Sequence, residues 1–176
     1  MRTLFITLGI VILIPLVAFD RKPKEVDIPC KQEGLSDSQH FRASGSAKSR
    51  DMASAKDKSL LVAKQTLASL IGSTIESVSS SYSSSLSGSS NSFKEAFETL
   101  TRETVNQQLK NVSISCQKVN KTKEGYEVFT AVEMSKIKLI EAISSNIQEN
   151  QDLKVNFDEQ KFREIFDAEM KKIGDK

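Results

Sequence analysis

The sequence predicts an α+β fold, with a small antiparallel sheet of about three strands covered by a long helix and followed by additional C-terminal helices. Two observations lead to this prediction. Apolar residues recur at helical spacing over a long stretch that begins near Asp51, and a later stretch alternates apolar and polar residues with the period of a strand. The 176 residues suffice for one domain plus a leader but hardly for two cores, so we expect a single α+β domain over residues 40–176.

The first strand is predicted over residues 40–47, where side chains alternate and small residues dominate. Gly45 lies in the middle of this segment, and a glycine within a strand often marks a place where another backbone comes close. We therefore expect the folded domain to begin near His40, with a helix packed tightly over this strand.

A long helix is predicted from about Asp51 into a serine-rich tract, and Asp51 or Ser49 could cap its start. Its alanines would allow a close approach to the sheet, and its larger residues would fill the core. The positions that carry this pattern are Ala55, Ala63, Leu67, Leu70, Ile71, Ile75 and Val78.

The serine tract over residues 77–92 is expected to end this helix, because serine hydroxyl groups compete for backbone hydrogen bonds. The favoured interpretation is a frayed helix end and a loop, and the functional alternative is a flexible lid or a modification site. Helical spacing then resumes and predicts a second helix over residues 92–109, carried by Phe93, Phe97, Leu100, Val105 and Leu109.

A β-hairpin is predicted next, with its turn around Gly125. One face of this hairpin should be buried, and the alanine-bearing helix is the natural cover. The alternating apolar positions are Val112, Ile114 and Cys116 on the first strand and Tyr126, Val128, Val132 and Met134 on the second.

Two more helices are predicted after the hairpin. The first carries Ile137, Ile140, Ile143 and Ile147, and its early Lys136 lies at the end of the helix where the dipole disfavours a cation. The last helix could dock on its own domain, or it could pack on a partner or a second copy. Asp158 would cap it, and its apolar stripe consists of Phe162, Ile165, Phe166, Met170 and Ile173.

The N-terminus has the layout of an export signal, with Arg2 before an apolar run over residues 4–19. The run is shorter than the roughly 20 residues of a comfortable membrane span, and a buried core helix is disfavoured because no polar residues alternate within it. Residues 1–19 are therefore predicted to be a signal peptide or an N-terminal membrane anchor, and residues 20–39 an extended tether. We expect an exported protein of the periplasm or envelope, with membrane anchoring through residues 4–19 as an open alternative.

The chain contains two cysteines, Cys30 and Cys116. In an oxidising compartment they could form one disulfide that ties the N-terminal segment to the sheet. The alternative is that Cys116 is a small apolar residue on a strand and Cys30 a free thiol.

Composition argues against several classes of function. The 25 basic and 23 acidic residues are interspersed, so nucleic acid is not an expected partner. The single histidine, His40, has no nucleophile pattern or cluster of metal ligands near it in sequence. We predict no enzymatic activity, no catalytic, cofactor-binding or metal-binding residues, and no cofactor.

The stretch Ala43-Ser44-Gly45-Ser46-Ala47, the helical spacing that follows it and the hairpin with Gly125-Tyr126 together resemble the LPP-twenty-like lipoprotein family. The N-terminal domain of the flagellar assembly protein T is similar. The resemblance covers roughly residues 40–135 and implies an envelope protein with a sheet-and-long-helix fold and no known catalysis. No cysteine stands at the end of the apolar run, which puts lipid anchoring in doubt.

The function predicted from these observations is a non-enzymatic cell-envelope protein that acts as a binding or structural module in a larger assembly, with another envelope protein as partner. The alternative is a small-ligand binding or hydrolytic periplasmic protein with a loop-built site. That alternative predicts a pocket with convergent polar groups under the serine-rich segment.

Overall fold

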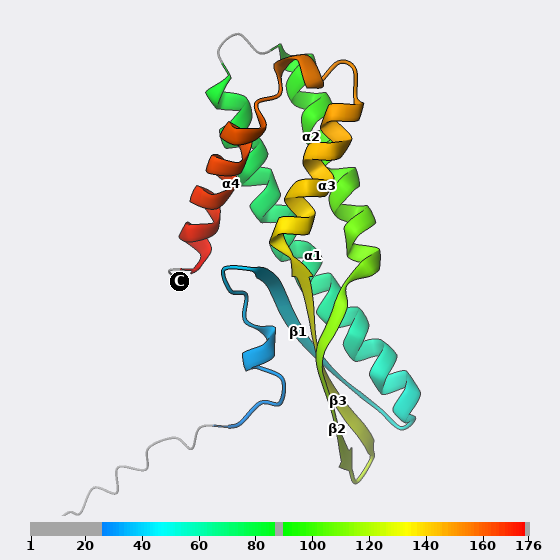
Figure 1. Ribbon diagram of the computed structural model, residues 1–176. Coiled ribbons are helices and arrows are strands. Elements are labelled where there is room, and N and C mark those ends of the chain that lie inside the picture. The colour runs from blue at the N-terminus through cyan, green and yellow to red at the C-terminus, as the bar shows by residue number, and fades with distance from the viewer. Residues whose placement is uncertain (1–25, 87–89, 175–176) are drawn as a thin grey trace, which may run out of the picture.

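The computed structural model describes residues 26–86 and 90–174 and confirms the α+β fold. The shorter α-helices gather with the second half of the longest helix at one end of the molecule, and a three-stranded antiparallel sheet forms the other end (Figure 1). The predicted leader over residues 1–19 and the first part of the predicted tether, residues 20–25, lie outside the described residues.

The sheet consists of β1 (His40–Ser49), β2 (Ser113–Thr122) and β3 (Gly125–Ser135), in the order β1-β3-β2. The long hairpin strand β3 is therefore central, and the first strand of the chain pairs with it over its whole length. A register shift between Ile114 and Cys116 marks a bulge in β2. The three strands and the hairpin are those that the alternating pattern predicts.

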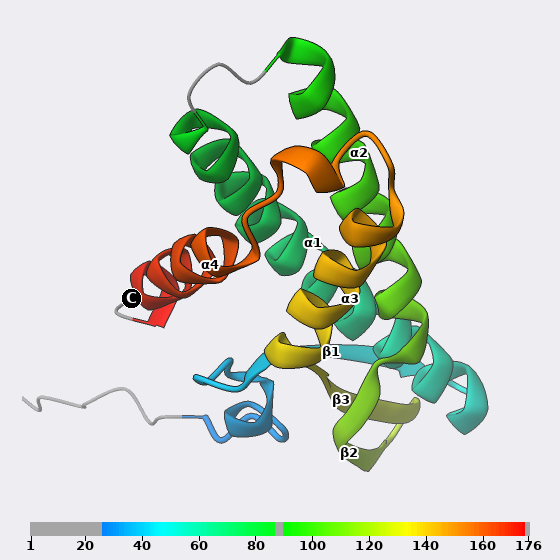
Figure 2. The same ribbon diagram turned by 45° about the horizontal axis from the view of Figure 1, so that its top comes forward.

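The helix α1 (Met52–Ser85) has 34 residues and is about 50 Å long. The Asp51 carboxylate accepts a hydrogen bond from the Ser54 N–H at 2.7 Å, which caps the helix start as predicted. The first half of α1 lies across β1 and β3, and the second half runs on into the group of helices, as Figure 2 shows from another side. One helix thus connects the two ends of the molecule.

The serine tract does not end α1 where the sequence predicts it. The helix continues to Ser85, so the predicted fraying from residue 77 is wrong for residues 77–85. Val78 and Tyr82 continue the helical spacing of buried residues and are fully buried, and this packing outweighs the modest helix propensity of the serines between them.

The remaining helices are α2 (Asn91–Gln108), α3 (Lys136–Glu149) and α4 (Glu159–Gly174), with short 3-10 turns at Gln32–Gly34, Leu109–Asn111 and Lys154–Asn156. α2 packs between α1 and α3, and α4 packs along α1. Phe162 and Phe166 of α4 are buried in the common core, so the last helix docks on its own domain.

An aromatic cluster joins the helices. Its central residue is Phe97, whose ring lies 5.1 Å from the Tyr82 ring and 5.8 Å from the Phe162 ring, measured between centroids. The Tyr82 hydroxyl accepts a hydrogen bond from the Asp158 N–H at 2.8 Å, just before α4 begins. Burial raises the pKa of the Tyr82 hydroxyl above its ordinary value. The cluster therefore fixes α4 and the end of α1 relative to α2.

The strand β2 departs from the predicted burial of the hairpin. α1 covers β1 and β3, but Ile114 and Val119 of β2 remain 50% and 39% exposed on the same side of the sheet. The prediction that the helix buries one face of the hairpin therefore holds for β3 and is wrong for β2.

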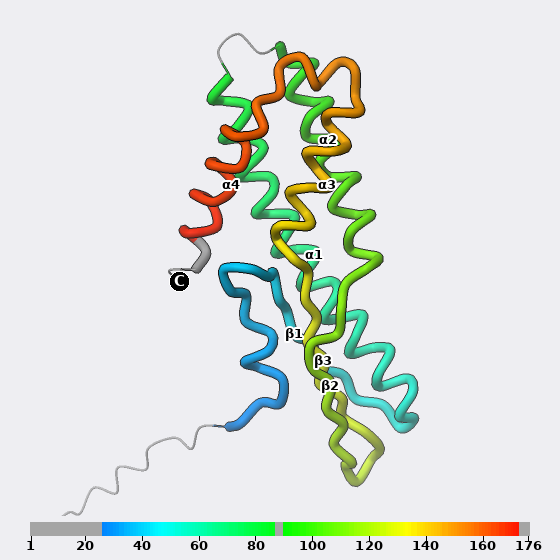
Figure 3. The backbone as a smooth tube through the Cα atoms, in the orientation of Figure 1, coloured from blue at the N-terminus to red at the C-terminus, as the bar shows by residue number. Residues whose placement is uncertain are grey.

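The segment from Cys30 to Gln39 lies against the sheet. Cys30 is buried, and a Cβ added to Gly34 would meet the Ser44 side chain at 2.7 Å. The tube in Figure 3 shows this segment running alongside the start of β1. Ordered packing in this part of the chain thus begins ahead of His40, within the segment that the sequence describes as a tether.

Candidate functional site

A disulfide joins Cys30 to Cys116, with their Cα atoms 5.6 Å apart. These are the two residues that the sequence analysis considers either as a pair or as separate thiols. Cys116 lies on the edge strand β2, and Cys30 lies in the segment that precedes β1. The bond closes a loop with a sequence separation of 86 and fastens the start of the described chain to the exposed strand.

A polar cluster fastens the same segment to β1 and β3. The Arg42 guanidinium donates to the carboxylates of Asp37 and Glu133, and the hydrogen bond to Glu133, 2.8 Å long, is the main cause that raises the pKa of Arg42. The Asp37 carboxylate also accepts from the N–H groups of Gln39 and His40. The Gln39 N–H is the main cause that lowers the pKa of Asp37 to about 2, with His40 and Arg42 adding to it against the effect of burial.

Lys136 stands at the start of α3, where the helix dipole disfavours it, and the structure gives the reason. Its Nζ donates to the Asp37 carbonyl oxygen at 2.7 Å and lies 5.1 Å from the centre of the Phe41 ring. Burial lowers the pKa of Lys136, while the charges of Asp37 and Asp167 oppose this change. The residue is therefore a structural contact between α3 and the N-terminal segment.

His40 lies at the start of β1 and belongs to this cluster. Its Nδ1 is 3.7 Å from the Asp37 carboxylate and 3.5 Å from the Arg42 guanidinium. Among the described residues no serine or cysteine side chain forms a hydrogen bond with the imidazole, so the cluster does not contain a nucleophile activated by a base.

A groove of about 390 Å³ lies between the second half of α1 and α2. Side chains from two helices line it. The lining residues are Ala68, Gly72, Ile75, Glu76, Ser79 and Ser80 from α1, and Glu98, Arg102, Val105, Asn106 and Leu109 from α2 and the turn after it.

The groove combines an open wall with an unpaired hydroxyl. A Cβ added to Gly72 would meet no atom within 4 Å, so this glycine leaves space at the wall. Ser79 is only 2% exposed, and its Oγ has no hydrogen-bond partner among the described residues. A buried hydroxyl without a partner is costly, which makes Ser79 a candidate contact for a bound molecule.

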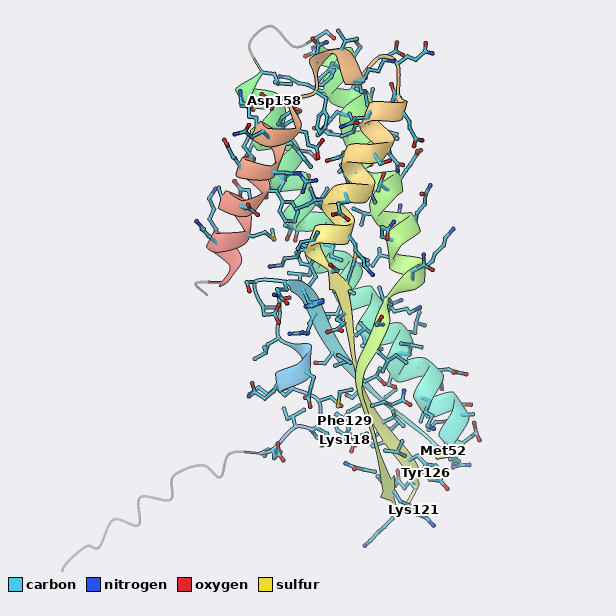
Figure 4. All side chains as sticks on the ribbon, in the orientation of Figure 1. Met52, Lys118, Lys121, Tyr126, Phe129 and Asp158 are labelled. Carbon is cyan, nitrogen blue, oxygen red and sulfur yellow. A yellow bond between two sulfur atoms is a disulfide. The ribbon has the colours of Figure 1, made fainter. Side chains whose placement is uncertain are left out.

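A second, more open cavity of about 660 Å³ lies at the far end of the sheet, lined by Lys48, Ser49, Arg50, Thr122, Lys123, Glu124 and Tyr126. Figure 4 shows Tyr126, Lys121 and Met52 at this end of the molecule, and Lys121 lies opposite Tyr126 in the pairing of β2 with β3. Lys118 lies further along β2, opposite Phe129. This end of the sheet thus carries more basic than acidic side chains, with Glu124 and Glu127 among them and Tyr126 and Met52 beside the lysines.

Within residues 26–86 and 90–174, no group of three or more His, Cys, Asp or Glu side chains is placed to hold a metal ion. None of the helices in these ranges is long and apolar enough to cross a membrane.

The sequence analysis offered the disulfide between the two cysteines as one of two alternatives, and it missed the groove. With the groove known, a pattern for it can be found in the sequence. Glu98, Arg102 and Asn106 follow one another at four-residue spacing on α2, and Gly72 and Glu76 are four residues apart on α1. Each series marks one line along a helix, but nothing in the sequence says that the two lines face each other.

Searches against known protein families, curated proteins and solved structures find no match to this chain. The resemblance to the LPP-twenty-like lipoprotein family therefore stays a prediction from the sequence.

Proposed function

We propose that this chain is an exported, non-enzymatic binding module of the cell envelope, and that β2 receives an acidic, extended segment of another envelope protein. The observation that carries the proposal is the exposure of β2. All residues of this ten-residue strand are exposed except the half-buried Cys116, and in the described sheet it pairs on one side only, with β3.

A strand at the edge of a sheet presents unpaired N–H and C=O groups to which an extended segment can add. On the side of the sheet that α1 covers over β1 and β3, Ile114 and Val119 give such a segment an apolar strip to cover. Lysines and a bulge are also the usual means of protecting an edge from non-specific pairing, and β2 has both. This protection favours a charge-selected partner over pairing between two copies of the basic strand.

The charge of β2 and its turn supports an acidic partner. Lys118, Lys121 and Lys123 stand on β2 and its turn, against one acidic residue, Glu124, in the same stretch. Complementary charges across an interface speed association and exclude partners of like charge. The partner segment would therefore carry aspartate or glutamate beside its apolar residues.

The disulfide supports the envelope as the compartment, because stable disulfides form in oxidising surroundings. It also anchors the middle of β2, so the exposed strand is held in place without a helix to cover it. Intact mass of the chain from fractionated cells tests this part of the proposal. We expect an exported chain whose mass rises by two hydrogens on reduction, and a reduced chain in the cytosol would overturn the envelope assignment.

Site-specific photo-crosslinking in cells tests the binding surface. A photoreactive residue at Val119 or Ile114 should cross-link to one envelope protein through an acidic segment. The same residue at Leu61, which is 56% exposed on α1, is the matched control and should not do so. The cross-linked segment, made as a peptide, should bind the purified chain less tightly after Lys118→Glu and Lys121→Glu, and less tightly at high salt. Three results would contradict the proposal: equal cross-linking at Leu61, a basic partner segment, or unchanged peptide affinity in the variant that carries both Lys118→Glu and Lys121→Glu.

A second candidate function, small-ligand binding, is favoured by the groove between α1 and α2. The serine-rich tract contributes Ser79 and Ser80 to the groove, but helices build it and not the loops that this alternative predicts. Hydrolysis is not favoured: a serine nucleophile needs a base beside it, and the only histidine of the chain, His40, lines a separate cavity near the sheet.

A further inference from the structure

The groove between α1 and α2 holds charged groups of both signs that are not paired with each other. Glu98 and Arg102 stand four residues apart on α2, a spacing that commonly gives an ion pair on a helix. Within the described residues, neither they nor Glu76 from α1 take part in an ion pair within 4.0 Å. One guanidinium and two carboxylates are thus free to bind groups of a ligand.

An apolar surface lies beside these charges. Ile75 and Val105 are buried and Leu109 is partly buried, and all three line the groove. A ligand that fits the groove therefore presents an apolar side chain as well as charged groups. The volume of about 390 Å³ is near the lower end of the range for small-molecule sites, which favours a ligand of a few tens of atoms at most.

We infer that this groove binds a small zwitterion with an apolar side chain, namely a free apolar amino acid or a dipeptide. Arg102 takes the carboxylate through paired hydrogen bonds, Glu76 and Glu98 take the ammonium group, and the side chain lies against Val105 and Leu109. Asn106 and Ser79 supply further polar contacts, since a ligand oxygen beside Ser79 would give its hydroxyl the partner that it lacks. The site rests on the second candidate function and does not depend on docking at β2.

Gly72 provides a direct way to test the site. Because no atom lies within 4 Å of a Cβ at this position, Gly72→Leu should fold and place its side chain in the open space of the groove. The variant is expected to keep its helix content, to melt no lower than the unchanged chain because leucine has a higher helix propensity than glycine, and to lose binding. It should also keep the cross-link from Val119, which separates a failure of this inference from a failure of the proposed docking strand.

The binding experiment uses leucine and leucyl-leucine as probes, titrated calorimetrically into the purified exported chain with its disulfide intact. We expect leucyl-leucine to bind, and its N-acetyl and C-amide derivatives, each of which lacks one charge, to bind about tenfold more weakly or worse. Arg102→Gln should weaken binding of leucyl-leucine but not change the already weak binding of the amide. Arg163→Gln on α4, where the arginine is paired with Glu159, is the matched control and should bind as the unchanged chain does.

Three outcomes would overturn the inference. They are absence of binding by both probes at millimolar concentration, unchanged binding in Gly72→Leu, and equal affinity for leucyl-leucine and its two blocked derivatives. The last result would indicate an apolar surface that binds the leucine side chains and does not discriminate between charged and blocked termini. Loss of binding in Gly72→Leu and Arg102→Gln, with unchanged binding in Arg163→Gln, would support the inference.

Discussion

The two ends of α1 pack against their surroundings in different ways. Over the sheet the helix contributes Ala55, Ser59 and Ala63, which let its backbone approach β1 and β3 closely, and Ser59 shares a 2.7 Å hydrogen bond with Thr130. Among the other helices it contributes larger residues, ending with Tyr82 in the aromatic cluster. The same helix therefore obtains stability from tight contact at one end and from large buried rings at the other.

The two ends of α1 also differ in the neighbouring surface that the helix leaves uncovered. At the sheet end the helix is too narrow to cover a third strand, so β2 stays exposed and is held by the disulfide. At the other end small residues on α1, including Gly72, leave a groove beside α2. The following predictions test whether the two ends are stabilised as this comparison suggests.

The largest effect is expected at the aromatic cluster. Phe97→Ala removes a fully buried ring that contacts several others, and should lower the free energy of unfolding by about 3–5 kcal/mol. Guanidinium denaturation of the oxidised protein measures it, with the exposed Leu61→Ala as a control that should change stability by no more than about 0.5 kcal/mol. A loss below about 1 kcal/mol for Phe97→Ala would mean that the rings do not hold the helices together.

Removing the disulfide should have the next largest effect. Replacing Cys30 and Cys116 together by serine is expected to lower stability by about 2–4 kcal/mol, because the bond restricts a long loop in the unfolded chain. Amide hydrogen exchange locates the effect: β2 should exchange faster while α2 and α4 change less. Uniformly faster exchange would show instead that the two ends unfold as one unit.

The two glycines that face α1 and the groove form a matched pair. A Cβ at Gly45 would lie 2.5 Å from the Ala63 backbone nitrogen, so Gly45→Ala should cost about 1–3 kcal/mol by forcing the helix away from β1. Gly72→Ala meets nothing and should raise stability by up to about 1 kcal/mol through helix propensity. Thermal unfolding of both variants checks the pair, and an equal cost at both positions would refute the close contact over the sheet.

The smallest effect concerns pH and the polar cluster of the N-terminal segment. The pKa of Asp37 is lowered from 3.8 to about 2 in the folded chain, so its ionised form stabilises the fold above about pH 4, and this contribution is lost as the pH falls through 2. Asp37→Asn should therefore cost stability at pH 7, and this cost should shrink as the pH falls from 4 toward 2. Because the side chain is 45% exposed, we expect less than about 1 kcal/mol, measured by urea denaturation across this range. An equal loss of stability at both ends of this pH range would show that Asp37→Asn acts through altered packing or hydrogen bonding and not through the lost charge.

Much of the fold follows from periodicity in the sequence. The three strands, the start of α1 at its Asp51 cap, and the four helices follow from local patterns that the structure confirms. The expected end of α1 was wrong because that prediction depended on the modest helix propensity of serine. The helix continues because Tyr82 packs against Phe97 of α2, and such a contact between two helices cannot be seen in the local sequence.

The candidate sites were harder to predict, because they too depend on contacts between residues far apart in the chain. Cys30 and Cys116 could be recognised as a potential pair because two cysteines permit one intramolecular bond. The burial of Lys136 beside Asp37 and Phe41 brings together groups from three parts of the chain, and its sequence position suggested only an unfavourable helix start.

By itself, the sequence determined the elements of this protein, because a helix or strand with one buried face repeats its apolar residues with a fixed period. The tertiary structure alone decided that α1 covers two strands and not three, that β2 is an exposed edge, and that Arg102 on α2 and Gly72 on α1 line one groove. These features depend on the order of strands and on which helix faces meet, and such contacts between residues far apart in the chain leave no periodic trace in the sequence.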